Sequence, residues 1–138
     1  MSRRVAREIA FKTLFQYDIG KNDTEPAVSQ LIEENGLEGG NMEFARQLVS
    51  GTLENLQAID AKLTTYLQKW ELGRLAAADR NVLRLATYEL LYRDDIPAAV
   101  TINEALDLSK AFHSEEAAKF LNGVLDKLAR DHQGGEVD

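Results

Sequence analysis

The sequence predicts an all-α fold of six or seven helices with no strand. Over most of the chain, apolar residues recur at the three- and four-residue spacing of helices rather than in the alternation of strands. The chain has only two prolines and is rich in Ala, Leu, Glu and Lys, which favour helix. No internal repeat or low-complexity segment interrupts this pattern, and 138 residues are typical of a single domain.

The N-terminal part predicts two helices followed by a long helical stretch. The first helix spans residues 3–19, and Gly20 suits the position just after a helix end. A short helix begins near Pro26, because proline is well accommodated in a first turn. Residues 42–69 form either one long helix or two helices divided near Asn55.

The C-terminal part predicts three helices after a connector at residues 70–75. Their expected ranges are 77–93, 101–112 and 114–130. Pro97 follows the first of them, Thr101 and Glu104 have the form of a capping box for the second, and Ser114 can cap the third. The acidic, glycine-containing tail at residues 131–138 is expected to be disordered.

Composition excludes several classes of protein. The chain has no cysteine, so it has neither a disulfide nor a thiolate metal site nor a cysteine nucleophile. No segment approaches the ~20 apolar residues of a membrane span, and no apolar stretch of the signal-peptide type opens the chain. We therefore expect a cytoplasmic protein.

Charge is divided unevenly along the chain, whose net charge is −7. The first dozen residues carry four cations and one acid: Arg3, Arg4, Arg7 and Lys12 against Glu8. Such a cluster on an acidic protein indicates attraction to an anionic partner, with nucleic acid as the first candidate. Residues 21–60 are strongly acidic and would repel RNA.

The helical wheel of residues 3–19 separates two sectors. The core sector contains Ala6, Ile9, Ala10, Leu14 and Tyr17. The neighbouring sector contains Arg4, Arg7, Phe11 and Phe15. Cations interleaved with aromatic rings suit an RNA or peptide surface. The alternative, equally favoured by the pattern, is that the two rings belong to the core and the arginines are solvated.

Isolated polar residues favour structural roles over catalytic ones. Glu89 lies among apolar residues and is expected to be paired, with Arg93 as one candidate partner, or to cap a neighbouring helix. His113 and His132 are interpreted as loop or surface residues. The sequence contains no metalloprotease, dinucleotide-binding or phosphate-loop motif, so we expect no enzymatic activity, no cofactor and no metal.

Four stretches together resemble the NusB family of transcription antitermination factors: RRVARE at 3–8, LRLATYEL at 83–90, TINEA at 101–105 and FLNGVLD at 120–126. The resemblance covers roughly residues 2–130. It implies two small helical bundles packed together, which we assign to residues 1–69 and 70–130. It also implies a non-enzymatic role: binding boxA RNA of nascent ribosomal RNA jointly with the ribosomal protein NusE, so that RNA polymerase reads through terminators.

The same resemblance implies roles for individual residues. Arg3, Arg4 and Arg7 fall in the RNA-binding start of the family, and Lys119 and Phe120 fall in its second RNA-contacting segment. Phe15 and Asp79 fall where the family meets NusE. Glu116 falls at an acidic position that tunes RNA affinity. Two other functions stay open: an accessory domain of an RNA-modifying enzyme, and a module whose arginines bind an acidic protein.

Overall fold

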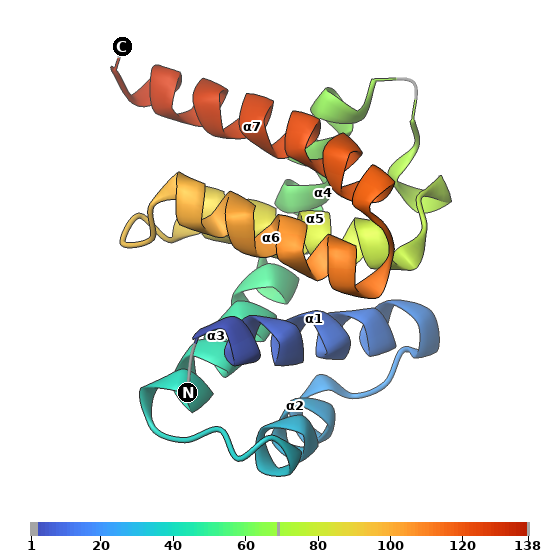
Figure 1. Cartoon of the computed structure of the whole chain (residues 1–138), viewed down its shortest axis with the longest axis vertical. Coiled ribbons are helices and arrows are strands. Elements are labelled where there is room, and N and C mark those ends of the chain that lie inside the picture. Colours follow the sequence, from blue (N-terminus) through green and yellow to red (C-terminus); the bar gives the residue numbers. More distant parts are fainter. Residues whose placement is uncertain (1–2, 69, 138) are drawn as a thin grey trace.

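The computed structural model describes residues 3–68 and 70–137, and side chains as far as residue 133. Within these ranges the chain forms seven α-helices, one short 3-10 helix and no strand, so the predicted all-α class is confirmed (Figure 1). The helices are α1 (Arg3–Gly20), α2 (Thr24–Glu34), α3 (Gly40–Glu54), α4 (Leu56–Leu67), α5 (Ala77–Tyr92), α6 (Ala98–Phe112) and α7 (Glu115–Val137), and the 3-10 helix is η1 (Leu72–Arg74). Residues 1, 2, 69 and 138, which end several of the predicted ranges, lie outside the described residues. No described helix is both long and apolar enough to cross a membrane.

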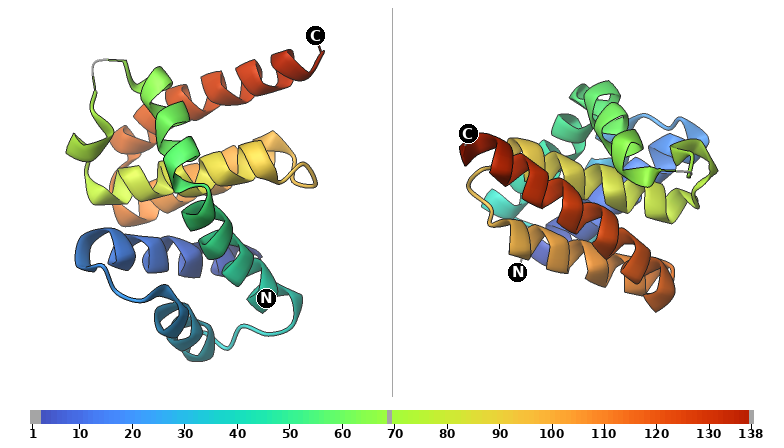
Figure 2. Two further views of the ribbon diagram at one scale, coloured as in Figure 1. Left: turned by 180° about the vertical axis from the view of Figure 1, so that it is seen from behind. Right: turned by 90° about the horizontal axis from the view of Figure 1, so that it is seen from above.

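The helices gather into two groups that pack on each other. In Figure 1, α1, α2 and α3 occupy the lower half and α4 to α7 the upper half. Helix α4 packs against α5 and α7, and the left view of Figure 2, seen from behind, shows it passing in front of α5. Residues 56–67 therefore pack with the C-terminal helices.

Helix α5 is the centre of the molecule, in contact with α1, α3, α4, α6 and α7. Its long buried run follows from this position, because a helix covered on several sides has little face left for water. At Gly51 of α3, an added Cβ would collide with the ring of Tyr88 on α5. Glycine at this position lets the two backbones pack together.

Two helix ends differ from the prediction, and at residues 42–69 the structure decides between the two predicted alternatives. Helix α1 includes Gly20, and Lys21 adopts the left-handed conformation at φ 57° while donating its backbone N–H to Tyr17. Residues 42–69 are two helices, divided at Asn55. Helix α6 begins at Ala98, with Pro97 at its N-cap, so Thr101 lies inside the helix and is not its cap.

The last helix continues to Val137, through the segment that was predicted to be disordered from residue 131. No proline stops the helix after Arg130, and the Tyr66 hydroxyl donates a hydrogen bond of 2.8 Å to the Asp131 carboxylate. This contact ties the extension to α4 and gives the tail a partner that its composition did not reveal.

Candidate nucleic-acid interface

The first turn of α1 presents two exposed arginines. The Arg3 guanidinium lies 4.2 Å from the centre of the Phe44 ring. Arg4, whose side chain is 61% exposed, donates hydrogen bonds of 2.9 Å to Glu104 and 2.6 Å to Asp107 on α6. These carboxylates, Glu104 first, raise the pKa of Arg4 above its ordinary value. Both arginines are thus positioned at the surface, but Arg4 is already held by two acids.

Arg7 does not belong to this surface, contrary to the prediction. Its side chain is 5% exposed and donates from Nε and Nη2 to the two oxygens of Glu89, each at 2.8 Å. Thr101 of α6 donates a third hydrogen bond of 3.0 Å to Glu89. The guanidinium faces the interior, where Glu89 of α5 accepts both hydrogen bonds and Glu104 of α6 lies 3.9 Å from Nη1.

This arrangement also settles the role of Glu89. The predicted structural role is confirmed, since both oxygens are occupied by Arg7 and Thr101 at a site that is 2% exposed. The suggested partner Arg93 is wrong: Arg93 instead donates to Asp95 from Nε and Nη2, each at 3.0 Å. A buried carboxylate with a paired charge fits a structural role better than a catalytic one.

The second predicted segment lies at the start of α7. The Ser114 hydroxyl accepts a hydrogen bond of 3.0 Å from the Ala117 backbone N–H, which confirms it as the cap. The next turn carries Lys119, exposed, and Phe120, half-buried. Glu116 is also exposed, on nearly the same face as Lys119 one turn later.

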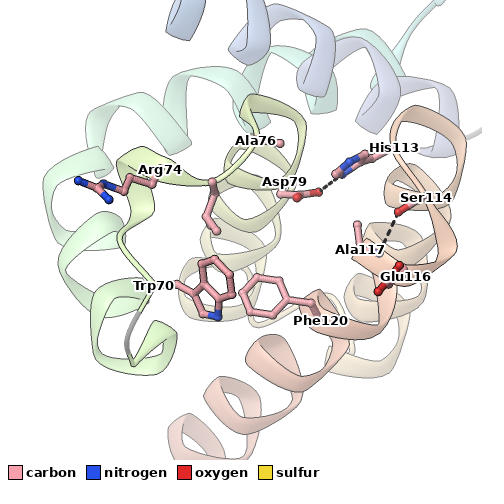
Figure 3. A pocket seen from close by; sticks show the side chains of 10 residues that line it. Trp70, Arg74, Ala76, Asp79, His113, Ser114, Glu116, Ala117 and Phe120 are labelled. Carbon is pink, nitrogen blue, oxygen red and sulfur yellow. Dashed lines mark hydrogen bonds and ion pairs between the residues drawn. The ribbon is translucent and has the colours of Figure 1, made fainter.

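Beside this turn lies a hollow of about 440 Å³, bordered by α7, η1 and the first turn of α5 (Figure 3). Trp70 and Phe120 meet at one end, with their ring centres 6.2 Å apart in an edge-to-face arrangement. At the other end, the carboxylate of Asp79 lies 2.8 Å from Nδ1 of His113. His113 is therefore a partnered residue at the rim of a hollow rather than the isolated histidine that the sequence suggested.

The two residues assigned to the protein partner border adjoining hollows. Phe15 lines a smaller apolar hollow of about 210 Å³ together with Phe11, Ala78 and Phe112. Asp79, next to Ala78, faces the larger hollow and is largely covered. Phe11 is buried in the core, as the alternative interpretation of these rings expected, whereas Phe15 is half-buried and packs against that core.

The candidate RNA residues form two separate groups rather than one cluster. Arg4 contacts the middle of α6, whereas Lys119 and Phe120 follow the far end of that helix (Figure 1). An extended RNA strand that runs along α6 could contact both groups. No periodic pattern in the sequence marks Trp70, which lies in a connector. No local pattern marks the acids Glu104 and Asp107, because their partner Arg4 is about a hundred residues away.

Among the side chains that the structure describes, no group of three or more His, Asp or Glu is arranged to hold a metal ion.

Comparison with known proteins places these features in a family. The model of the NusB family matches residues 4–130. A transcription antitermination protein NusB from Desulforamulus reducens is 48% identical, over 93% of this chain and 90% of the relative.

Two solved structures share the fold. The structure of T. maritima NusB has a TM-score of 0.89 and 44% identity, and the match covers 96% of this chain and 93% of that one. A crystal structure of antitermination factors NusB and NusE in complex with dsRNA has a TM-score of 0.86 and 27% identity, with 94% and 96% covered.

Proposed function

The chain belongs to the NusB family, and on this premise we propose that it is an RNA-binding transcription antitermination factor. It binds boxA RNA in nascent ribosomal RNA transcripts together with NusE, and so promotes read-through by RNA polymerase in the cytoplasm. The proposal is supported by two groups of surface side chains on a chain whose net charge is −7. Arg3 and Arg4 lie at the start of α1, and Lys119 and Phe120 lie at the start of α7. The relative in complex with NusE and dsRNA supports the choice of partners.

The two groups bind different parts of the RNA. Arg3 and Arg4 offer guanidinium groups to phosphate, which attracts RNA without regard to its sequence. Phe120 offers a ring on which an unpaired base can stack, and Lys119 on the same turn offers a further cation. Because this role is one of binding, it requires no catalytic residue.

The isolated chain is expected to bind RNA weakly. Arg7 is withdrawn into the ion pair with Glu89, and phosphate must compete with Glu104 and Asp107 for Arg4. Few free cations remain for phosphate. A partner that holds the same strand raises affinity, because the second contact becomes intramolecular.

The surface that we assign to NusE comprises the apolar hollow at Phe15 and Phe112 and, beside it, Asp79. Phe112 is 39% exposed although it touches Phe11, and Phe15 is half-buried beside it. Partly exposed aromatic rings around a hollow are typical anchors of protein interfaces.

The test is a titration of end-labelled boxA RNA by fluorescence anisotropy, with and without NusE, at two salt concentrations. We expect tighter binding with NusE and a dissociation constant that rises with salt. Arg4→Ala should weaken binding, whereas Lys62→Ala, which removes the same charge from exposed α4, should not. Equal effects of the two variants would remove Arg4 from the RNA surface, and absence of binding even with NusE would refute the function.

A further inference from the structure

The hollow between Trp70 and Phe120 has the size and the shape of a small-ligand site. Its volume of about 440 Å³ lies within the roughly 300–1,000 Å³ of such sites. Figure 3 shows Trp70 and Phe120 side by side at one end and the Asp79–His113 pair at the other, with Glu116 on the α7 wall. An aromatic end and a polar end in one hollow suit a flat molecule with hydrogen-bonding edges.

Trp70 is unusual in being left uncovered. It is the only tryptophan of the chain, and 55% of its surface is exposed. Phe120 approaches it edge to face, with an interplanar angle of 68°. This contact holds the indole at the mouth of the hollow without stacking a second ring on it, so an indole face is available to a further ring.

The charges of the hollow decide which part of a nucleotide can enter. Glu116 and Asp79 line it, and the only cations among its lining residues are Arg74 and, when protonated, His113. Asp79 already lies 2.8 Å from His113, and Arg74 points away from the ring pair toward solvent. Such a lining repels phosphate but accepts a neutral base, while Lys119 and Arg74 outside the hollow can attract the flanking phosphates.

We propose that this hollow receives one unpaired nucleobase of the RNA strand, stacked on Trp70, with its polar edge toward the Asp79–His113 pair, where the hollow borders the surface assigned to NusE. The proposal rests on the proposed function and adds a site to it. The hollow is continuous with the candidate RNA segment, because Phe120 is both its wall and a member of that segment. Bases of single-stranded RNA are commonly recognised by stacking on aromatic side chains and hydrogen bonding at their edges.

The sole tryptophan makes the proposal directly measurable. We expect unlabelled boxA RNA to change the emission of Trp70, with the same midpoint as the anisotropy of end-labelled RNA. Trp70→Ala should weaken binding about five- to 150-fold, which corresponds to the roughly 1–3 kcal/mol of one base–aromatic stack. Trp70→Phe should recover most of the affinity.

The salt dependence separates stacking from charge. Trp70→Ala removes no phosphate contact, so it should leave the slope of affinity against salt unchanged, whereas Lys119→Ala should lower that slope by about one. Tyr92→Ala is the matched control: Tyr92 is an aromatic residue that is 43% exposed at the opposite end of α5, and its loss should leave RNA affinity unchanged. Circular dichroism checks that each variant is folded.

The outcomes distinguish the site from the function. If labelled RNA binds but Trp70 emission stays constant and Trp70→Ala binds as tightly as the wild type, the base site is refuted and the function stands. If NusE alone changes the emission and Trp70→Ala loses NusE but not RNA, the hollow is a protein-docking site and the proposal is overturned. If no RNA binds with NusE present, it is the function that fails. RNA carrying one abasic residue, moved along the strand, should abolish the emission change at a single position.

Discussion

Arg7→Ala is the substitution for which the structure most changes the expectation, from loss of RNA binding to loss of stability. The variant removes the partner of a carboxylate that is 2% exposed and leaves Glu89 with Thr101 alone. Breaking a buried ion pair by removing one partner costs about 3–5 kcal/mol. An exposed arginine would cost far less.

The size of this loss can be converted into a shift of the melting temperature. With an unfolding entropy of about 2.1 cal/mol/K per residue, a chain of 138 residues has about 0.29 kcal/mol/K. The expected loss then lowers Tm by about 10–17 °C. Thermal melting followed by circular dichroism measures this shift well above its error.

Two matched variants test the reasoning. Lys12→Ala removes a half-exposed partner of Glu8 on the same helix, and such pairs contribute about 0.3–0.5 kcal/mol, so Tm should fall by about 1–2 °C. The double variant Arg7→Met with Glu89→Leu replaces both charges by apolar groups and should recover most of the lost stability. If Arg7→Ala melts within about 3 °C of the wild type and binds RNA less well, Arg7 is a surface residue in solution and our assignment is refuted.

Three further predictions concern charge. Arg4→Ala should weaken RNA binding and lower its salt slope by at most about one, because Arg4 must leave two acids to reach phosphate, and an unchanged slope would mean that Arg4 stays with its acids in the complex. Glu116→Asn should tighten RNA binding at low salt, because it removes a repulsive charge near Lys119. The gain should shrink at high salt. Equal dissociation constants of the variant and the wild type at low salt would place Glu116 away from the RNA. Burial acts to raise the pKa of Asp18, but hydrogen bonds from Arg80 and Asn81 outweigh it and lower that pKa below its ordinary value. The stabilisation is therefore present above about pH 4 and lost at lower pH, so Asp18→Asn should lower Tm at neutral pH and flatten its fall below about pH 4; parallel melting curves would contradict this.

The helices were predictable because each carries its own apolar pattern. The ends of the helices were less predictable. At the start of α6, two competing signals for the helix end, Pro97 and Thr101, lie only a few residues apart. Thr101 has the form of a cap, yet Pro97 fixes a backbone that can enter the helix a turn earlier. The threonine hydroxyl is then free to serve Glu89, a contact that no local pattern encodes.

The residues of the site were predictable only where their exposure does not depend on a partner far away in the sequence. Arg3 and Arg4 are exposed in the first turn of α1, and a run of cations is sufficient to find them. Arg7 has the same chemistry and lies one turn later, but its partner Glu89 is 82 residues away, so burial depends on how α5 packs on α1. An unpaired acid on the apolar face of one helix and an arginine beside the apolar face of another are the signal that could have paired them.

Two of the candidate RNA contacts, Arg4 and Lys119, have a carboxylate nearby, and this sets how binding should respond to salt. When Arg4 leaves Glu104 and Asp107 to bind a phosphate, it neutralises the phosphate but leaves the two carboxylates without their cation. Lys119 approaches phosphate in the presence of Glu116 one turn earlier. A salt slope reflects the charges that binding neutralises, so the slope of the isolated chain should be smaller than its number of phosphate contacts. Asp107→Asn should therefore raise both the affinity and the slope, because it leaves Glu104 as the one acid bonded to Arg4 and adds no contact, whereas Asp126→Asn, at an exposed pair with Arg130 on α7, should change neither.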